Sequence, residues 1–462
     1  MLWVIVSIWA LLGCNKTGVV IGEPPSELDQ PTGIEVLFNH NEHSTFRNPL
    51  TGNWRHGDDF EAFLLKHLKQ AKREVLVAVQ ELTLPSISQA LVKAHQRGVD
   101  VKLVVENNYS NPWGKLHEAD LTVSERQRLR RLKALADQNH DGALSVEERI
   151  QGDAIQILIN HHIPLIDDTE DGSKGSGLMH HKFVIIDGHT VITGSTNFTS
   201  SGFYGDANSP RTRGNVNHLL SLQSIDLANI FRAEFLQLWG DGPGGKKDSQ
   251  FGRKKKAQEV ETAVVKDSIV EVLFTPHSAQ DDRNAIHWIS KHLSQANKTI
   301  DLALFVFSEQ SLANTLQENV KSGLRLRLLA DPSFANRSFS EVLDLLGLSL
   351  SDRFCKIEAG NSPWPTPFQD VGTPHLSRGD KLHHKFGVID NNKVITGSFN
   401  WSPSAAFNND ETILIIHSAQ LAKHFTREMN RLWRGAELGI TDRMRRKMVR
   451  QQQICGNGVE RR

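Results

Sequence analysis

Two stretches of this sequence repeat one pattern: residues 180–197 read HHKFVIIDGHTVITGSTN, and residues 383–400 read HHKFGVIDNNKVITGSFN. Both fit the spacing H-x-K-x4-D-x6-G-S-x-N. In each copy an apolar run follows the lysine, which is typical of a buried strand, and a Gly-Ser turn ends the next apolar run. A pattern of this length, present twice, indicates that the chain consists of two related halves.

The similarity between the halves continues upstream of the pattern. The matching segments are KHLKQA at 66–71 with KHLSQA at 291–296, GVDVKL at 98–103 with GLRLRL at 323–328, and EVLF at both 35–38 and 271–274. Each half alternates amphipathic helices with apolar strands, the clearest being 75–79, 101–105, 300–306 and 324–329. The sequence therefore predicts the α/β class, with two duplicated domains at residues 34–240 and 263–440.

The segments outside these domains have simpler compositions. Residues 1–14 are an apolar run that ends Leu-Leu-Gly-Cys and resembles a bacterial signal peptide with a lipoprotein box, in which Cys14 is the lipidation site. Because the run lacks Lys and Arg, an uncleaved anchor or a misplaced start is the alternative. Residues 15–33 indicate a tether, 241–262 a solvated basic linker, and 441–462 a basic tail with a surface helix. A protein of the bacterial cell envelope, lipid-anchored in the membrane or secreted, is expected.

Composition excludes several classes of protein. The chain has 462 residues, 39% hydrophobic and 23% charged, so it is a globular protein long enough for two or three domains. Its 53 basic and 53 acidic side chains balance, so it lacks the strong positive field of a nonspecific DNA coat. Three cysteines, at 14, 355 and 455, are too few for a disulfide scaffold, a Cys-rich zinc site or an iron–sulfur cluster. Whether the last two pair is left open.

The first half carries an insertion between Glu106 and His180, and its segment at about 120–152 predicts a calcium site. A helix over 124–136 leads into a loop that fits the EF-hand pattern, with a glycine at 142 for the sharp turn. The predicted Ca²⁺ ligands are Asp137, Asn139, Asp141, the Ala143 carbonyl, Ser145 and Glu148. EF-hands usually occur in pairs and the sequence has no second such loop, so a structural role is expected. An acidic helix cap formed by chance is the alternative.

The repeated pattern also collects groups suited to phosphodiester chemistry. Because side chains alternate along a strand, His180 and Lys182 share one face while His181 points to the other. Covalent catalysis at phosphorus needs a neutral imidazole to attack, a protonated imidazole to supply a proton, and cations for the nonbridging oxygens. The candidates are His180, Lys182, His383 and Lys385, with Ser195, Asn197, Ser398 and Asn400 as donors to phosphate.

With these residues the sequence resembles the phospholipase D superfamily, in which two such motifs meet across a pseudo-twofold axis. The resemblance covers about residues 33–435. It implies one active site shared by both domains, metal-independent phosphodiester cleavage without a catalytic cofactor, and a phosphohistidine intermediate. Asp187 and Asp390 complete the family's motif, and we interpret them as structural partners that fix the loop after the strand. A monomer with a pseudo-dimeric core is expected.

The halves differ downstream of the motif, where Glu411 aligns with Asn217. In the family an acidic residue at this position supports the catalytic histidine. A carboxylate beside an imidazole raises the pKa of the ring, whereas a neutral amide orients the ring without that effect. The sequence therefore predicts that Glu411 supports His383 as the general acid and that Asn217 supports His180 as the nucleophile.

The sequence predicts the reaction more specifically than the substrate, because enzymes acting on lipids and on nucleic acids share this fold and chemistry. A lipid anchor would place the protein beside phospholipid, which favours cleavage of phospholipid headgroups. Basic segments at 246–256 and 443–450 suit a nucleic-acid backbone, so a nuclease is the second candidate. A noncatalytic calcium-binding envelope protein is the third, and the two intact motifs argue against it.

Overall fold

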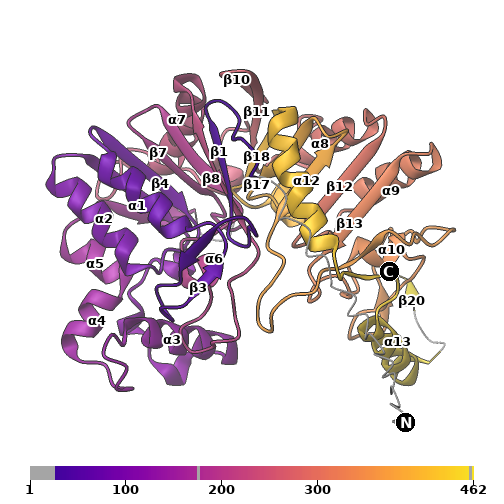
Figure 1. The fold of residues 1–462 in the computed structure, drawn as a ribbon, viewed down its shortest axis with the longest axis horizontal. Coiled ribbons are helices and arrows are strands. Elements are labelled where there is room, and N and C mark those ends of the chain that lie inside the picture. The colour runs from indigo at the N-terminus through magenta and orange to yellow at the C-terminus, as the bar shows by residue number, and fades with distance from the viewer. Residues whose placement is uncertain (1–26, 174–176, 457–459, 462) are drawn as a thin grey trace, which may run out of the picture.

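The computed structural model describes residues 27–173, 177–456 and 460–461, and these fold into two α/β halves that lie side by side (Figure 1). The predicted signal peptide with Cys14 lies outside the described residues. Each half is built on one large mixed sheet, so the expectation of duplicated α/β domains is confirmed. None of the described helices is long and apolar enough to cross a membrane.

The first sheet has the strand order β1-β9-β8-β7-β4-β5-β6. Its strands are β1 (Ile34–Phe38), β4 (Glu74–Val79), β5 (Asp100–Val105), β6 (Leu165–Asp167), β7 (Lys182–Ile186), β8 (Thr190–Gly194) and β9 (His218–Gln223). Strand β4 pairs in parallel with β5 and antiparallel with β7, so the end of β4 lies beside the start of β7. The residues that follow β4 therefore meet the first motif.

The second sheet has the order β10-β11-β18-β17-β16-β12-β13-β15-β19. Its strands are β10 (Glu261–Val265), β11 (Ser268–Phe274), β12 (Thr299–Leu304), β13 (Arg325–Ala330), β15 (Val371–Thr373), β16 (Lys385–Ile389), β17 (Lys393–Gly397), β18 (Thr412–His417) and β19 (Glu437–Leu438). From β11 to β15 this order repeats the first sheet strand for strand, with β12 and β16 in the places of β4 and β7. Two small pairs lie outside the sheets: β2 (Thr45–Arg47) with β3 (Trp54–His56), and β14 (Lys356–Ile357) with β20 (Glu460–Arg461).

Two long helices, one from each half, share the core between the sheets. Apolar side chains of α7 (Ile225–Trp239) and α12 (Ala419–Trp433) form one buried cluster with residues of both sheets. Ser224 and Ser418 cap these helices in the same way, each accepting a hydrogen bond from the backbone N–H three residues later. The other helices are α1 (Phe60–Gln70), α2 (Pro85–Gln96), α3 (Val123–Ala136), α4 (Val146–Gly152), α5 (Ala154–Asn160), α6 (Ser200–Phe203), α8 (Ala285–Ser294), α9 (Gln310–Lys321), α10 (Glu341–Leu345), α11 (Pro403–Phe407) and α13 (Asp442–Cys455).

Backbone hydrogen bonds join the halves next to the two motifs. The N–H of His180 donates to the carbonyl of Asp410 at 2.9 Å, and the N–H of His383 donates to the carbonyl of Val216 at 3.0 Å. Each motif thus begins on a segment that the opposite half holds. This reciprocal arrangement is the pseudo-twofold pairing that the sequence predicts, and it brings both motifs to one place.

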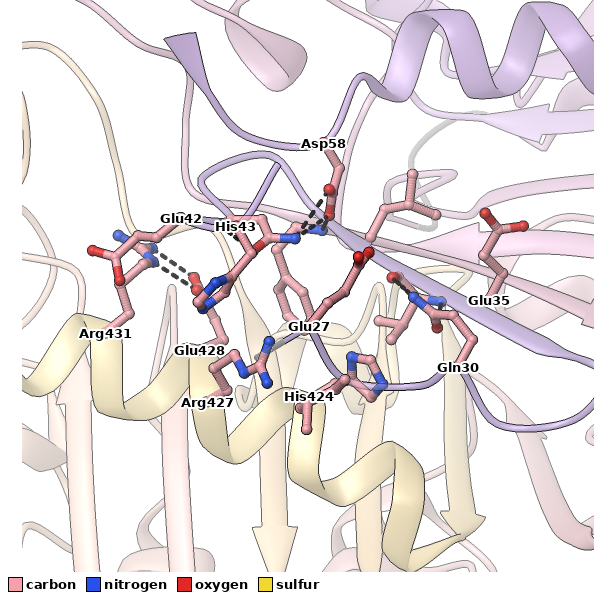
Figure 2. A pocket seen from close by; sticks show the side chains of 15 residues that line it. Glu27, Gln30, Glu35, Glu42, His43, Asp58, His424, Arg427, Glu428 and Arg431 are labelled. Carbon is pink, nitrogen blue, oxygen red and sulfur yellow. Dashed lines mark hydrogen bonds and ion pairs between the residues drawn. The ribbon is translucent and has the colours of Figure 1, made fainter. Parts of the chain in front are cut away.

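The end of the predicted tether belongs to the fold. Residues 27–43 lie along α12, and the two segments together with Asp58 line a pocket of 230 Å³ (Figure 2). Gln420 donates to the carbonyl of Asp29 at 2.9 Å, and His424 hydrogen-bonds the same carbonyl at 3.1 Å. The start of the described chain therefore fastens the first half to the second.

The linker is also more than a solvated loop. The Lys255 side chain is only 4% exposed and forms ion pairs with Glu234 of α7 and with Asp410, the latter at 2.8 Å. The prediction of a solvated linker is wrong at this lysine, because two buried carboxylates neutralise its charge. The linker therefore joins the halves beside the segment that holds the first motif.

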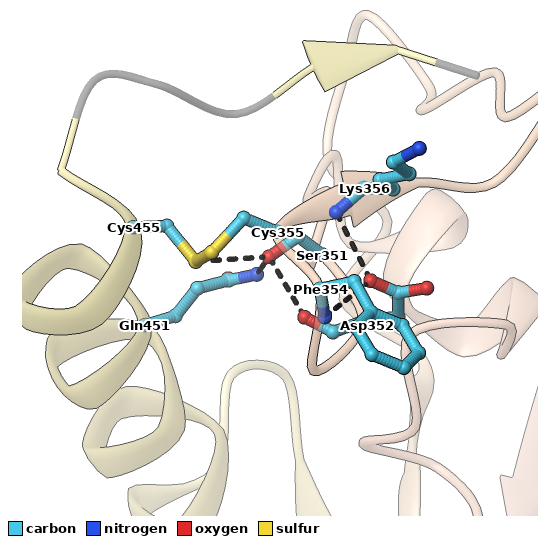
Figure 3. Close-up of a disulfide and its surroundings, with 7 residues drawn as sticks. All are labelled: Ser351, Asp352, Phe354, Cys355, Lys356, Gln451 and Cys455. Atoms are coloured by element: carbon cyan, nitrogen blue, oxygen red, sulfur yellow. Dashed lines mark hydrogen bonds between the residues drawn. A yellow bond between two sulfur atoms is a disulfide. The ribbon is translucent and has the colours of Figure 1, made fainter.

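A disulfide joins Cys355 to Cys455 (Figure 3). Cys455 is the last residue of α13, the basic helix that the sequence places on the surface, and Met444 is its buried residue. Beside the disulfide, Gln451 hydrogen-bonds Ser351. The bond spans a sequence separation of 100 residues, for which the chain-entropy model gives a stabilisation of about 4–5 kcal/mol.

Candidate active site

Two histidines, one from each motif, are supported by side chains of the opposite half. His180 Nδ1 lies 2.6 Å from Glu411 Oε2, and His383 Nδ1 lies 2.9 Å from Asn217 Oδ1. The Asn217 amide nitrogen donates to backbone carbonyls, so its oxygen is the acceptor. Both rings therefore donate from Nδ1, and among the described residues Nε2 of neither ring has a hydrogen-bond partner. The predicted pairing of Glu411 with His383 is wrong.

The crossing follows from how the halves dock. Val216 pairs with Leu382, and Met179 pairs with Asp410, as isolated bridges between the halves. Asn217 and Glu411, which follow Val216 and Asp410, therefore lie beside the histidine of the other half's motif. Alignment of the repeat identified both supporting residues, but it paired each of them within its own half.

The serines of the Gly-Ser turns hold these supporting groups. Ser195 Oγ donates to Asn217 Oδ1 at 2.8 Å, and Ser398 Oγ donates to Glu411 Oε2 at 2.7 Å. Both serines are fully buried, and their hydroxyls position the supporting groups. The prediction that these hydroxyls donate to phosphate is therefore wrong.

The asparagines of the same turns are only half-buried. The Oδ1 atoms of Asn197 and Asn400 have no hydrogen-bond partner among the described residues. The nitrogen of the Asn197 amide donates to Gln80 Oε1 at 3.2 Å. The atoms without a partner are acceptors, so donation from these two amides to phosphate stays a prediction.

The motif lysines occupy the same buried region. Lys182 Nζ donates to the carbonyl of His180 at 2.7 Å, and Lys385 Nζ donates to that of His383 at 2.8 Å. Burial lowers the pKa of Lys182 to about 7, and the charge of Glu411 opposes this shift. Burial and then the charge of Lys182 lower the pKa of Lys385 well below its ordinary value. A phosphate anion between the lysines would favour their charged forms, so the region is suited to bind one.

The same effects act on the histidines. Burial lowers the pKa of His180 to about 4, although the charge of Glu411 acts in the opposite direction. Burial, followed by the charges of Lys385 and Lys182, lowers the pKa of His383 well below its ordinary value. In the free protein, burial therefore favours the neutral form of both rings. A substrate anion raises both pKa values, so it favours uptake of the proton that catalysis needs.

Asp187 and Asp390 have the structural role that we expected. The Asp187 carboxylate accepts hydrogen bonds from the backbone N–H groups of residues 72–74, and that of Asp390 accepts from residues 297–299. These carboxylates follow β7 and β16, so a five-residue strand separates each from its motif histidine. They anchor the turns that lead into β4 and β12, away from the reacting groups.

The second histidine of each motif is part of the core. His181 Nε2 lies 2.9 Å from Glu234 Oε1 of α7, and His384 Nε2 lies 2.9 Å from Glu428 Oε1 of α12. All four side chains are buried. The alternation predicted along the strand is thus observed: one histidine faces the site while its neighbour faces the helices.

One difference between the halves was not predicted. Gln80 and Phe305 occupy equivalent positions directly after β4 and β12, where each donates its backbone N–H to a motif histidine carbonyl. Gln80 Oε1 accepts hydrogen bonds from Asn197 Nδ2 and, at 3.4 Å, from Lys182 Nζ. The Phe305 ring instead lies 4.7 Å from the ring of His383, centroid to centroid. A residue-by-residue alignment of the two halves would have found this pair. The two residues are separated by the same number of positions as the neighbouring matched segments.

The predicted calcium ligands lie in the loop between α3 and α4. Asp137 Oδ2 accepts a hydrogen bond from the N–H of Gly142 at 3.0 Å, and the Glu148 carboxylate accepts from loop N–H groups. Asp137 Oδ1 is buried and has no partner among the described residues. Over the part of the chain that the structure describes, no group of three or more His, Cys, Asp or Glu side chains is placed to hold a metal ion. The carboxylates of the loop thus point mainly to its backbone.

Comparisons with known proteins agree with this geometry. The model of the family described as "Cardiolipin synthase, PLD-like domain" matches residues 64–239 and 289–433, one segment in each half. The mitochondrial cardiolipin hydrolase of Mus musculus is 28% identical over 158 residues, which cover 34% of this chain and 62% of that protein. The phospholipase D of Rickettsia bellii (strain RML369-C) is 27% identical over 158 residues, which cover 34% of this chain and 66% of that protein. Each alignment thus spans less than two thirds of the relative.

A solved structure extends the likeness to both halves. The crystal structure of phosphatidylserine synthase from Haemophilus influenzae Rd KW20 superposes with a TM-score of 0.52 at 12% sequence identity. The superposition covers 88% of this chain and 87% of that one. At this identity the likeness concerns the fold alone, and it includes the whole two-domain arrangement.

Proposed function

We propose that this chain, which belongs to the family of cardiolipin synthase, PLD-like domains, is a phosphodiesterase that cleaves phospholipid headgroups through a phosphohistidine. The observation that carries the proposal is the crossed pair of histidines, His180 on Glu411 and His383 on Asn217. Two imidazoles with free Nε2 atoms and different supporting groups can supply a nucleophile and an acid. The motif lysines supply positive charge for the nonbridging oxygens.

The supporting groups assign the two roles. When an imidazole Nε2 bonds to phosphorus, its ring carries a positive charge while the intermediate lasts, and a carboxylate on Nδ1–H stabilises that charge. The general acid instead loses its charge in the same step, which a neutral amide and neighbouring lysines favour. We therefore assign His180 as the nucleophile and His383 as the general acid. These are the roles expected from the sequence, with the supporting groups exchanged.

The reaction then takes two steps. First, His180 Nε2 attacks phosphorus, the bond from phosphorus to the headgroup oxygen breaks, and His383 gives its Nε2 proton to that oxygen. Second, His383 takes a proton from water, the water oxygen attacks phosphorus, and the phosphorus–nitrogen bond breaks. The products are a phosphomonoester lipid and the free headgroup alcohol, and both rings return to their starting states.

Phospholipid is the proposed substrate because the relatives above are named cardiolipin hydrolase and phospholipase D. Lipidation of Cys14 would keep the enzyme at a membrane of the bacterial envelope, and this localisation is part of the proposal. A nuclease is the second candidate, favoured by the exposed basic residues of α13. Both motifs lie in one chain, so a monomer contains a complete site.

The full chain is expected to release headgroup alcohol from phospholipid vesicles and to leave single-stranded and duplex DNA intact. Because histidines and lysines supply every catalytic group, EDTA should change the initial rate by less than about twofold. Alcohol release and DNA fragment length are measured side by side, with His180→Ala as the inactive control. Cleavage of DNA but not of lipid would select the nuclease, and cleavage of neither would contradict a phosphodiesterase.

We also propose that the loop 137–148 binds Ca²⁺ as a structural ion. The buried Oδ1 of Asp137 has no partner in the described structure, and a cation would satisfy it. Further oxygen ligands would come from Asn139, Asp141, the Ala143 carbonyl, Ser145 and Glu148, which is the ligand chemistry that Ca²⁺ prefers.

Calcium is expected to raise the melting temperature of the full chain by several degrees relative to EDTA. An ion present at 100 times its Kd stabilises the folded state by about 2.7 kcal/mol. Turnover per folded molecule should change little, because the loop lies in an insertion outside the motifs. Asp137→Asn should abolish the thermal shift while Glu147→Gln, which is not a predicted ligand, keeps it. Equal melting temperatures of the unaltered chain with EDTA and with millimolar calcium would contradict the site.

A further inference from the structure

The ring of Phe305 lies among three basic side chains of the second motif. Its centroid is 4.7 Å from that of the His383 ring, at an interplanar angle of 54°. Lys385 Nζ lies over the Phe305 ring at 4.9 Å from its centroid, and Lys381 Nζ lies over it at 5.5 Å. Because side chains alternate along an extended chain, residues 381, 383 and 385 share one face. One aromatic ring therefore contacts three groups that carry or can take up a positive charge.

The first half has different residues at the equivalent positions. Gln80 and Leu178 stand where the second half has Phe305 and Lys381. The histidine of the first motif has the Glu411 carboxylate as a counter-charge, whereas the histidine of the second motif has a neutral amide. The aromatic ring thus lies beside the histidine that a carboxylate does not support.

The charges around His383 act against its protonated form. Burial lowers the pKa of this ring most, followed by the charges of Lys385, Lys182, His180 and Lys381. The carboxylates of Glu411 and Asp331 raise the pKa of Lys385. A general acid must carry its proton, and an aromatic ring attracts a cation, most strongly where both are removed from water. Phe305 places such a ring beside the histidine that needs it.

We propose that Phe305 is a positioning residue for the general acid: its ring holds the His383 imidazole in place and favours the protonated form. It supports the cation without a full negative charge, which would hold the proton more strongly. The inference rests on the proposed phosphohistidine mechanism and adds the group that keeps the acid protonated. The proton still passes from Nε2 of His383 to the headgroup oxygen, so both steps of the reaction are unchanged.

Phe305→Leu tests the ring, because leucine keeps an apolar side chain and removes the aromatic face. The alkaline limb of kcat, which reports the acid in the substrate complex, should move to lower pH by about 0.5–1. Phe305→Tyr keeps the ring and should keep the profile of the unaltered chain. The matched control is Phe334→Leu, because this ring packs on Phe305 at 4.7 Å between centroids. The control should leave the limb in place, and an equal shift would overturn the inference, since packing alone would then explain it.

A titration that needs no turnover separates failure of this inference from failure of the proposed function. The full chain is labelled with ¹³C at histidine Cε1 for NMR, and the His383 signal is identified by its loss in His383→Ala. With inorganic phosphate present, the pKa of His383 should be lower in Phe305→Leu than in the unaltered chain and unchanged in Phe334→Leu.

The same pKa in Phe305→Leu and in the unaltered chain overturns the inference, whether or not lipid is hydrolysed. A lower pKa in a chain that hydrolyses no lipid supports the action of the ring and contradicts the proposed function. A lower pKa with a shift of the acidic limb also supports the ring, and it reverses the proposed roles of the two histidines.

Discussion

Replacing His180 or His383 by alanine is expected to lower kcat by roughly 10⁴-fold or more and to leave the fold intact. Each ring has a role that the other cannot take over, because His180 has a carboxylate on Nδ1 and His383 has a neutral amide. The loss should be similar for the two variants, since groups that act as one unit are not additive. The loss in kcat is measured as the rate of headgroup release at saturating substrate.

The matched control is His189→Ala, since this histidine lies in the same motif segment but is exposed. It should retain near-normal turnover, and the melting temperatures of all three variants should stay close to that of the unaltered chain. Near-normal turnover of either motif variant would refute the catalytic assignment. A denaturing quench with substrate labelled at phosphorus should place the label on the peptide that contains His180. Label on His383 would reverse the two roles.

The features that sequence predicted well are those that local pattern encodes. Apolar runs of strand length predicted β4, β5, β12 and β13 within one or two residues, because a buried strand shows itself in consecutive side chains. Alternation along the motif separated the site histidine His180 from the core histidine His181 in the same way. The duplication supplied the two-domain architecture, since two copies of one motif require two similar scaffolds.

The features that sequence missed depend on contacts across the molecule. Glu411 supports His180 because the halves dock through the segment at Asp410, and no local pattern specifies that docking. Lys255 lies in a run of basic residues typical of solvent, yet its partners Glu234 and Asp410 come from elsewhere in the chain. In both cases the missing information is which residue, distant in the sequence, lies opposite.

Glu411→Gln is expected to lower kcat by roughly 10²-fold, because the phosphohistidine cation at His180 loses its counter-charge. The amide keeps the size of the side chain and can still accept from His180 and from Ser398, which lies 2.7 Å from Oε2. Thermal melting checks that the variant folds. The matched change on the other side is Asn217→Asp, which adds a carboxylate to His383.

The pH profile distinguishes the roles. The pKa of His180 is lowered to about 4 by burial, and Glu411 opposes this shift, so Glu411→Gln lowers that pKa further. Since the nucleophile must be neutral, the acidic limb of kcat/KM should move to lower pH. Asn217→Asp should raise the pKa of His383, so the alkaline limb, where the acid loses its proton, should move to higher pH. If Glu411→Gln moves the alkaline limb instead, the carboxylate supports the general acid and the two histidines have exchanged roles. If neither limb moves in either variant, the hydrogen-bonded pairs do not set the protonation of the reacting rings.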